Sequence, residues 1–187
     1  MGAIASQFSA KRQQEHKILL VGLVGSGKTT MLHSLKAGEV CMDIPTIGFN
    51  VETLELRGGM MNITSILAWD VGGPDRIRGL WRRYYRDVDG LVFMADSSDR
   101  DRVDDAREQI QFILREEELL DKPLLVFANK QDLPNVMSVA ELVDKLSLNQ
   151  IGDRRWFIQE SVAMEGKGIN PGLEWLSRQF DCNVSSG

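Results

Sequence analysis

The sequence predicts an α/β fold in which a mostly parallel β-sheet is covered by helices on both faces. Two observations lead to this prediction. Short apolar runs of strand length alternate along the chain with longer segments of helical periodicity, as in doubly wound sheets. A glycine-rich segment, residues 22–30, stands between the first apolar run and the first helical segment. A strand, a turn and a helix N-terminus in this order form a binding site for phosphate.

Strands are expected where an apolar run is short and bounded by glycine or polar residues. The runs 91–94 and 124–127 are continuously apolar, as strands covered on both faces are. The pair Gly58-Gly59 is expected to form a hairpin turn between the second and third strands. The six expected strands are residues 18–23, 51–57, 62–70, 90–95, 124–129 and 156–161.

Helices are expected where apolar residues recur at spacings of three or four. The segment 101–118 places Val103, Ala106, Ile110 and Ile113 on one face. Its acidic residues at 101, 104 and 105 favour a helix N-terminus there, since that end of the helix dipole is positive. The five expected helices are residues 28–36, 77–85, 101–118, 139–146 and 171–180.

Length and composition indicate one domain. The chain has 187 residues, of which 43% are hydrophobic and 26% charged, which is ordinary for a globular protein and argues against disorder. The net charge of −5 argues against a nucleic-acid partner. The cysteines, Cys41 and Cys182, lack metal-binding spacing and fit a reducing compartment. No apolar run approaches the roughly 20 residues of a membrane span. We expect a domain over residues 17–181, an N-terminal segment 1–16 and a short tail 182–187.

The motif G-x-x-x-x-G-K-T at residues 22–29 predicts a phosphate-binding loop. Its glycines allow backbone N–H groups to point inward without a Cβ in the way. Lys28 would reach the β- and γ-phosphates, and the Thr29 hydroxyl would hold Mg²⁺. The alternative, a chance glycine-rich turn, is disfavoured because Lys-Thr and both flanking elements are in place. The expected loop residues are Gly22, Leu23, Val24, Gly25, Ser26, Gly27, Lys28, Thr29 and Thr30.

Two further segments could complete a phosphate and metal site. Asp70 ends an expected strand and is followed by Gly73. Such a carboxylate can hold Mg²⁺ through water, and Gly73 can offer its N–H to a γ-phosphate. Thr46 lies in the loop before the second strand, from which it could close over the γ-phosphate and add a hydroxyl ligand to Mg²⁺. Taken alone, each could equally be a capped turn.

The run Asn129-Lys130-Gln131-Asp132 also ends an expected strand. An ionised carboxylate only accepts hydrogen bonds, and guanine presents adjacent donors at N1 and N2, so Asp132 matches guanine and leaves adenine poorly paired. By itself an N-K-x-D run is a weak signal. Its order and spacing relative to the other three segments make coincidence remote. The expected ligands are therefore GTP or GDP with Mg²⁺, and the guanine motif disfavours an ATP-dependent kinase.

These runs resemble those of small GTPases of the ADP-ribosylation factor (Arf) and Arf-like family. The resemblance covers nearly the whole chain, and T-I-G-F-N-V and W-D-V-G-G are specific to that branch. It implies a three-layer P-loop small-GTPase fold with a six-stranded sheet. The runs are the phosphate loop, P-T-I-G-F-N-V-E at 45–52, W-D-V-G-G at 69–73, L-W-R-R-Y at 80–84, L-L-V-F-A-N-K-Q-D-L-P at 124–134 and G-L-E-W-L at 172–176.

The resemblance implies a GTP/GDP switch that recruits effectors to membranes in vesicle traffic. Exchange factors, GTPase-activating proteins and effectors would be its partners, and the protein would be a monomer, cytoplasmic and reversibly bound to the Golgi or another endomembrane. The stretch Ser161, Val162 and Ala163 would contact the guanine oxygen. The aromatic side chains of Phe49, Trp69 and Tyr84 would form the effector patch, although they could instead be ordinary core residues.

Two departures from the family bear on hydrolysis. The family usually has glutamine after W-D-V-G-G to orient the attacking water, but this chain has Pro74, which has neither an amide side chain nor an N–H. Val24 stands where Arf proteins typically have aspartate. Among the expected catalytic positions Lys28, Thr46 and Pro74, the last is therefore expected to be inactive. A working GTPase and a GTP-binding interaction module with very slow hydrolysis both remain open. Residues 52–69 are also about five residues longer than in Arf proteins, near residues 58–61.

The N-terminus predicts a lipid anchor. Its first six residues fit M-G-x-x-x-[ST], so Gly2 could be myristoylated. Ile4 and Phe8 would share one face of an amphipathic helix. That helix would be a second membrane contact, which is needed because one acyl chain binds only marginally. An unmodified tail is the alternative.

Overall fold

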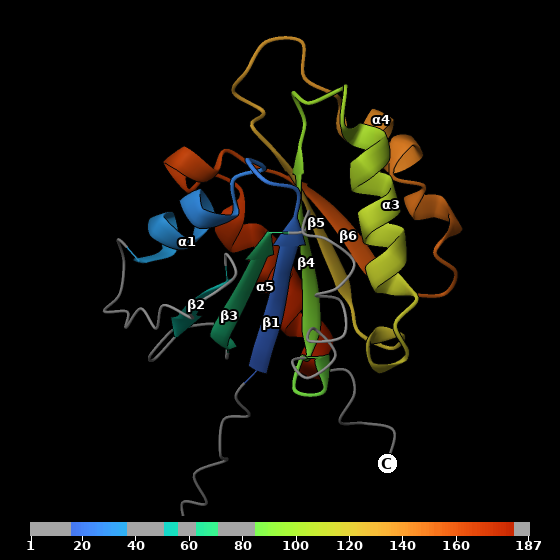
Figure 1. Ribbon diagram of the computed structural model, residues 1–187. Helices are drawn as coiled ribbons and strands as arrows, with labels where there is room; N and C mark the ends of the chain where they lie inside the picture. The colour runs from blue at the N-terminus through green and yellow to red at the C-terminus, as the bar shows by residue number, and fades with distance from the viewer. Residues whose placement is uncertain (1–15, 37–50, 56–62, 71–84, 182–187) are drawn as a thin grey trace, which may run out of the picture.

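The computed structural model describes residues 16–36, 51–55, 63–70 and 85–181 (Figure 1). Within 51–55 and 63–70 it describes the backbone, together with the side chains of Ile66 and Ala68. The expected helix 77–85, apart from its last residue, and the expected turn at Gly58-Gly59 lie outside the described residues.

The strands form one sheet in the order β2-β3-β1-β4-β5-β6. Four neighbouring pairs are parallel, and the fifth, β2 with β3, is antiparallel. The predicted α/β class with a mostly parallel sheet is therefore confirmed. The bounds are β1 His16–Gly22, β2 Val51–Glu55, β3 Ile63–Asp70, β4 Gly90–Asp96, β5 Leu124–Asn129 and β6 Trp156–Glu160.

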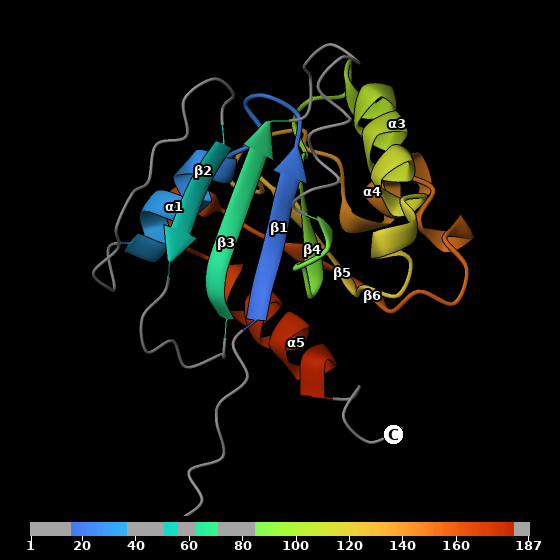
Figure 2. The same cartoon turned by 60° about the horizontal axis from the view of Figure 1, so that its bottom comes forward.

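Helices cover both faces of this sheet. Figures 1 and 2 show α1 and α5 on one face, with α3 and α4 on the other. The bounds are α1 Lys28–Lys36, α3 Val103–Leu114, α4 Val139–Lys145 and α5 Ile169–Asp181, with the 3₁₀ turns η2 Glu117–Leu119, η3 Leu148–Gln150 and η4 Ala163–Glu165.

The core consists of two apolar layers, one on each side of the sheet. Along β1, Leu19 and Val21 belong to the layer under α3 and α4, whereas Ile18 and Leu20 belong to the layer under α1 and α5. This division follows from the period of two in a strand. It explains why the central strands are continuously apolar, because every side chain of such a strand faces a helix layer.

Three boundaries of the described helices differ by two residues or more from the sequence predictions. Helix α3 begins at Val103 rather than 101, because the Asp99 carboxylate accepts the backbone N–H of Arg102 at 3.1 Å and holds a turn there. Its predicted last turn is replaced by η2, which buries Leu119 completely. Helix α5 begins two residues early, at Ile169, which is buried.

His16, which the sequence analysis assigned to the N-terminal segment, is the first residue of β1. Its ring is buried, with its centroid 4.4 Å from that of Phe180 in α5. The first strand therefore begins one residue before the expected start of the domain at residue 17. Among the described residues, none of the helices has both the length and the apolar character needed to cross a membrane.

Candidate guanine-nucleotide site

The carboxyl ends of the central strands bring the motif segments to one edge of the sheet. Register places Gly22 beside Asp70 and Asp96 beside Asn129. The Ser161 N–H donates to the Ala128 carbonyl at 2.9 Å, which places the segment after β6 next to them. Ligands of open α/β sheets bind at this edge.

The loop between β1 and α1 requires glycine at Gly27. Its φ is +107°, and a Cβ there would lie 2.2 Å from the Asn129 Nδ2 atom. At Gly25, with φ of +84°, nothing lies within 4 Å of a Cβ position. Gly25 is thus required by backbone conformation, whereas Gly27 is also required by contact.

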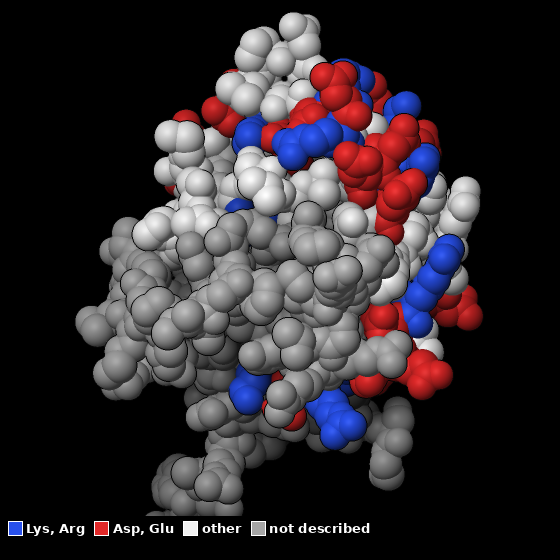
Figure 3. All heavy atoms as spheres, in the orientation of Figure 1, with Lys and Arg blue, Asp and Glu red and all other residues white. Residues whose placement is uncertain are grey.

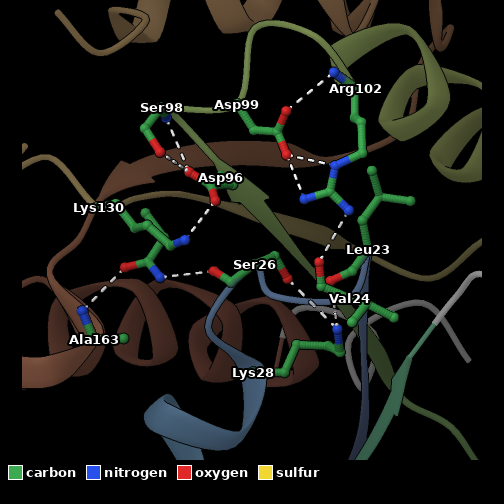
Figure 4. Close-up of polar contacts among 11 residues, drawn as sticks. Leu23, Val24, Ser26, Lys28, Asp96, Ser98, Asp99, Arg102, Lys130 and Ala163 are labelled. Atoms are coloured by element: carbon green, nitrogen blue, oxygen red, sulfur yellow. Dashed lines mark hydrogen bonds and ion pairs between the residues drawn. The ribbon is translucent and has the colours of Figure 1, made fainter.

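Lys28 is buried and holds the loop from within (Figure 4). Its Nζ atom donates to the carbonyls of Gly22 at 2.8 Å and Leu23 at 2.9 Å. The Ser26 hydroxyl lies 3.5 Å from the same nitrogen. A positive charge is therefore fixed inside the loop, where it favours an anion.

Asn129 joins the three loops of the site. Its Nδ2 atom donates to the Ser26 carbonyl at 2.8 Å. Its Oδ1 atom accepts from the Ala163 N–H at 3.0 Å and from the Ser161 hydroxyl at 3.2 Å. Because Asn129 is only 2% exposed, each of these bonds would leave a buried polar group unpaired if it were lost.

Lys130 adopts a left-handed backbone conformation, with φ of 65°. Its Nζ atom lies 2.5 Å from the Asp96 carboxylate, which also accepts from the Ser98 N–H and hydroxyl. Burial alone would raise the pKa of Asp96, but the hydrogen bonds from Lys130 and Ser98 outweigh it and lower that pKa below its ordinary value. The carboxylate is therefore ionised at neutral pH and fixes the aliphatic stem of Lys130 in the site.

Gln131 attaches the following loop to β4. Its Nε2 atom donates to the Ser97 hydroxyl at 2.8 Å and to the Met137 carbonyl at 3.2 Å. The adjacent Asp132 is exposed at the start of this fastened loop. The backbone that carries Asp132 therefore follows directly after an anchored residue, and its side chain is accessible to a ligand.

The family comparison agrees with this arrangement. A family model, Arf: ADP-ribosylation factor family, matches residues 2–180. The chain belongs to the ADP-ribosylation factor family. The fold is thus the P-loop GTPase α/β fold, and the Arf family supports assignment of the protein as a GTP-binding small GTPase switch.

The fit of this Arf protein to GTP or GDP with Mg²⁺, the ligands of Arf GTPases, can be judged from the described residues. A loop with a buried lysine and two glycines of positive φ is a cradle for phosphate. Thr29 is exposed at the first turn of α1 and available as a hydroxyl ligand. The residues present therefore fit a nucleotide with its metal.

Some expected site residues cannot be compared with the structure. The side chains of Trp69 and Asp70 are not described, although both residues belong to β3. The remaining ones lie outside the described residues: Gly2, Thr46, Phe49, Gly73, Pro74 and Tyr84.

Three residues of the site escaped the sequence analysis: Asp96, Ser97 and Arg102. Each acts through contacts with residues more than 30 positions away. For Asp96 and Ser97 the signal in the sequence was a polar pair at the end of a buried strand, which is the same placement that identified Asn129. For Arg102 the sequence showed only a charged residue near a helix start.

Proposed function

We propose that this Arf protein is a guanine-nucleotide switch that recruits effectors to membranes in vesicle-mediated traffic. The observation that carries the nucleotide-binding part of the proposal is the set of three Asn129 hydrogen bonds, which join the phosphate loop to the segment 161–163. In this proposal those bonds hold the phosphate cradle and the base loop next to each other. The traffic role is inferred from membership of the Arf family.

In this proposal the loop residues 22–30 and Gly73 contact the phosphates. Asp132 accepts from the guanine N1 and N2 donors, and the backbone of 161–163 faces the guanine oxygen. Support for the last role comes from the hydrogen bonds of Ser161 and Ala163 to Asn129, within a segment whose three residues are all buried. Thr29 and Thr46 would supply hydroxyl ligands to Mg²⁺, and Asp70 would hold it through water. The position of Asp70 beside Gly22 supports that role.

Membrane association is proposed to come from a myristoylated Gly2 and the amphipathic segment 1–16. Phe49, Trp69 and Tyr84 would form the surface that effectors read. Exchange factors and GTPase-activating proteins would set the nucleotide state of a monomeric, cytoplasmic protein that returns reversibly to an endomembrane. Membership of the Arf family supports the classes of partner, and the lipid anchor rests on the sequence motif.

A second reading is a GTP-binding interaction module with very slow hydrolysis. Pro74 replaces the usual water-orienting glutamine. Val24 is 55% exposed on the phosphate loop, so its branched side chain would stand where a catalytic group must approach. Neither departure removes a contact to phosphate or base, and binding is expected to survive.

The hydrolysis rate decides between these readings. Restoring the glutamine with Pro74→Gln should raise single-turnover GTP hydrolysis, measured with and without an activating protein, by about tenfold or more, which is about 1.4 kcal/mol of barrier. Pro171→Gln, at an exposed proline in the first turn of α5, is the matched control and should leave the rate unchanged. An ordinary Arf-like rate in the wild-type protein would show that another group positions the water.

Membrane binding should depend on the nucleotide. In the Arf family the hairpin between the switch segments slides by two residues when GTP binds and expels the N-terminal helix. A two-residue slide keeps each strand face in place, since strand side chains alternate with period two. The myristoylated protein should therefore pellet with liposomes more with a non-hydrolysable GTP analogue than with GDP.

Two variants test the parts of this coupling. Gly2→Ala should abolish pelleting in both states, because it removes the acylation site. Deleting residues 58–61 should preserve pelleting and weaken its nucleotide dependence. Equal pelleting of the unaltered protein in the two nucleotide states would contradict the coupling.

A further inference from the structure

Arg102, the residue before α3, binds the phosphate loop rather than its own helix. Its Nη1 atom donates to the Val24 carbonyl at 3.2 Å, across 78 positions of sequence. The Nε atom donates to the Asp99 carboxylate at 2.6 Å, and the Nη2 atom forms an ion pair with the same carboxylate. Figure 4 shows the guanidinium between Asp99 and the loop. Asp99 thus aims the arginine at Val24.

The phosphate loop directs several of its carbonyls towards side-chain donors. The carbonyls of Gly22 and Leu23 accept from Lys28, the Val24 carbonyl accepts from Arg102, and the Ser26 carbonyl accepts from Asn129. These donors come from α1, the segment before α3, and the end of β5. The loop conformation is therefore held from three separate elements.

Holding the Val24 carbonyl also fixes an N–H. In a planar trans peptide the carbonyl of one residue and the N–H of the next point in opposite directions. The Gly25 N–H therefore points away from Arg102. The Val24–Gly25 peptide is the central peptide of a turn closed by a bond from the Ser26 N–H to the Leu23 carbonyl at 3.2 Å. That bond is compatible with either orientation of the central peptide, and Gly25 has φ of +84° with open space at its Cβ position, so the bond from Arg102 selects one orientation.

We propose that Arg102 is a positioning residue for the phosphates of the bound nucleotide. By holding the Val24 carbonyl it presets the Gly25 N–H as a phosphate donor and slows release of the nucleotide. The inference rests on the proposed guanine-nucleotide function. It assigns to the start of α3 a part in setting how long the nucleotide stays bound.

Arg100 provides a matched control on the same surface. Its side chain is 49% exposed and that of Arg102 is 46% exposed, and each forms an ion pair. Arg100 instead binds Glu141 and the carbonyls of Asn135 and Val136. Figure 3 shows cationic and anionic side chains intermixed around the start of α3, so removing either cation changes the surface charge similarly.

The test is the release of a fluorescent GDP from the full-length protein, chased with excess GDP at fixed Mg²⁺. Arg102→Ala should release it about tenfold faster, the order expected for losing one hydrogen bond from a charged donor. The release rate of Arg102→Lys should lie between those of the wild type and Arg102→Ala. Lysine keeps the positive charge but lacks the forked guanidinium that binds both Asp99 and the Val24 carbonyl. Arg100→Ala should release it at the wild-type rate.

Competition with GMP separates positioning from general loosening of the fold. GMP lacks the outer phosphates, so its affinity should be the same for wild type and Arg102→Ala, whereas the affinity for GDP should fall. Unchanged release in both Arg102 variants, or an equal loss of GMP and GDP affinity, would overturn the proposal. Failure of the wild-type protein to bind labelled GDP would contradict the underlying function itself.

Discussion

Replacing Asp132 by asparagine is expected to lower the affinity for GTP by about 10³- to 10⁴-fold, because a site built on hydrogen bonds rejects a base that leaves them unpaired. The carboxylate accepts from both guanine donors, but an amide offers one acceptor and one donor. Xanthine carries an oxygen in place of the guanine amino group. Asp132→Asn should therefore bind xanthine nucleotides in preference to guanine nucleotides.

Competition of GTP, XTP and ATP against a fluorescent nucleotide measures this exchange of specificity. Asp153→Asn is the control. Asp153 is also exposed, but it lies before the amino end of β6, whereas the site lies at the carboxyl ends of the strands. It should bind like the wild type. If Asp132→Asn kept its preference for guanine, the base would be recognised elsewhere in the site.

Replacing Asn129 by alanine is expected to lower guanine-nucleotide affinity by about 10²- to 10³-fold, because three buried partners lose their hydrogen bonds and each unpaired group costs about 1–3 kcal/mol. The Ser26 carbonyl, the Ala163 N–H and the Ser161 hydroxyl would all be affected. The phosphate loop and the segment 161–163 would then move independently. Isothermal titration with GDP gives the loss directly.

Asn149→Ala is the matched control for that variant. Asn149 is exposed in η3, which follows α4 in the sequence and contains none of the site residues. It should retain wild-type affinity and melting temperature. A bound nucleotide raises the melting temperature of the folded protein by an amount that falls as its affinity falls. In Asn129→Ala the difference in melting temperature between the nucleotide-loaded and nucleotide-free forms should therefore be much smaller than in the wild type. Unchanged GDP affinity would show that the two loops are held together by other contacts.

The strand pattern and the motif segments were predictable because both depend on local sequence. A buried strand must be apolar on both faces, which identified β4 and β5 within one residue. The loop glycines, Lys28 and Asn129 were predictable because they lie at the carboxyl end of a strand or within the short loop that follows it. In a parallel sheet the ends of neighbouring strands meet at one edge, so the site followed from the strands.

Other features depended on contacts between distant segments. Arg102 could be read only as a charged residue at a helix start, because its partner Val24 lies 78 positions away. The structure also places Lys28 on the loop carbonyls, a contact that the motif does not express. His16 appeared to belong to the N-terminal segment because a lone histidine says nothing of its packing against Phe180.

We propose that the edge formed by the phosphate loop, Asn129 and Asp132 binds guanine nucleotides. Equilibrium titration of nucleotide-free protein with fluorescent GDP, followed by displacement with GTP, GDP and ATP in the presence of Mg²⁺, tests it most directly. We predict saturable binding of one GDP per chain, displaced by GTP and GDP and not by ATP at a thousandfold higher concentration, on the order that hydrogen-bonded base selection allows. Displacement by ATP at the same concentration as GTP would contradict the claim.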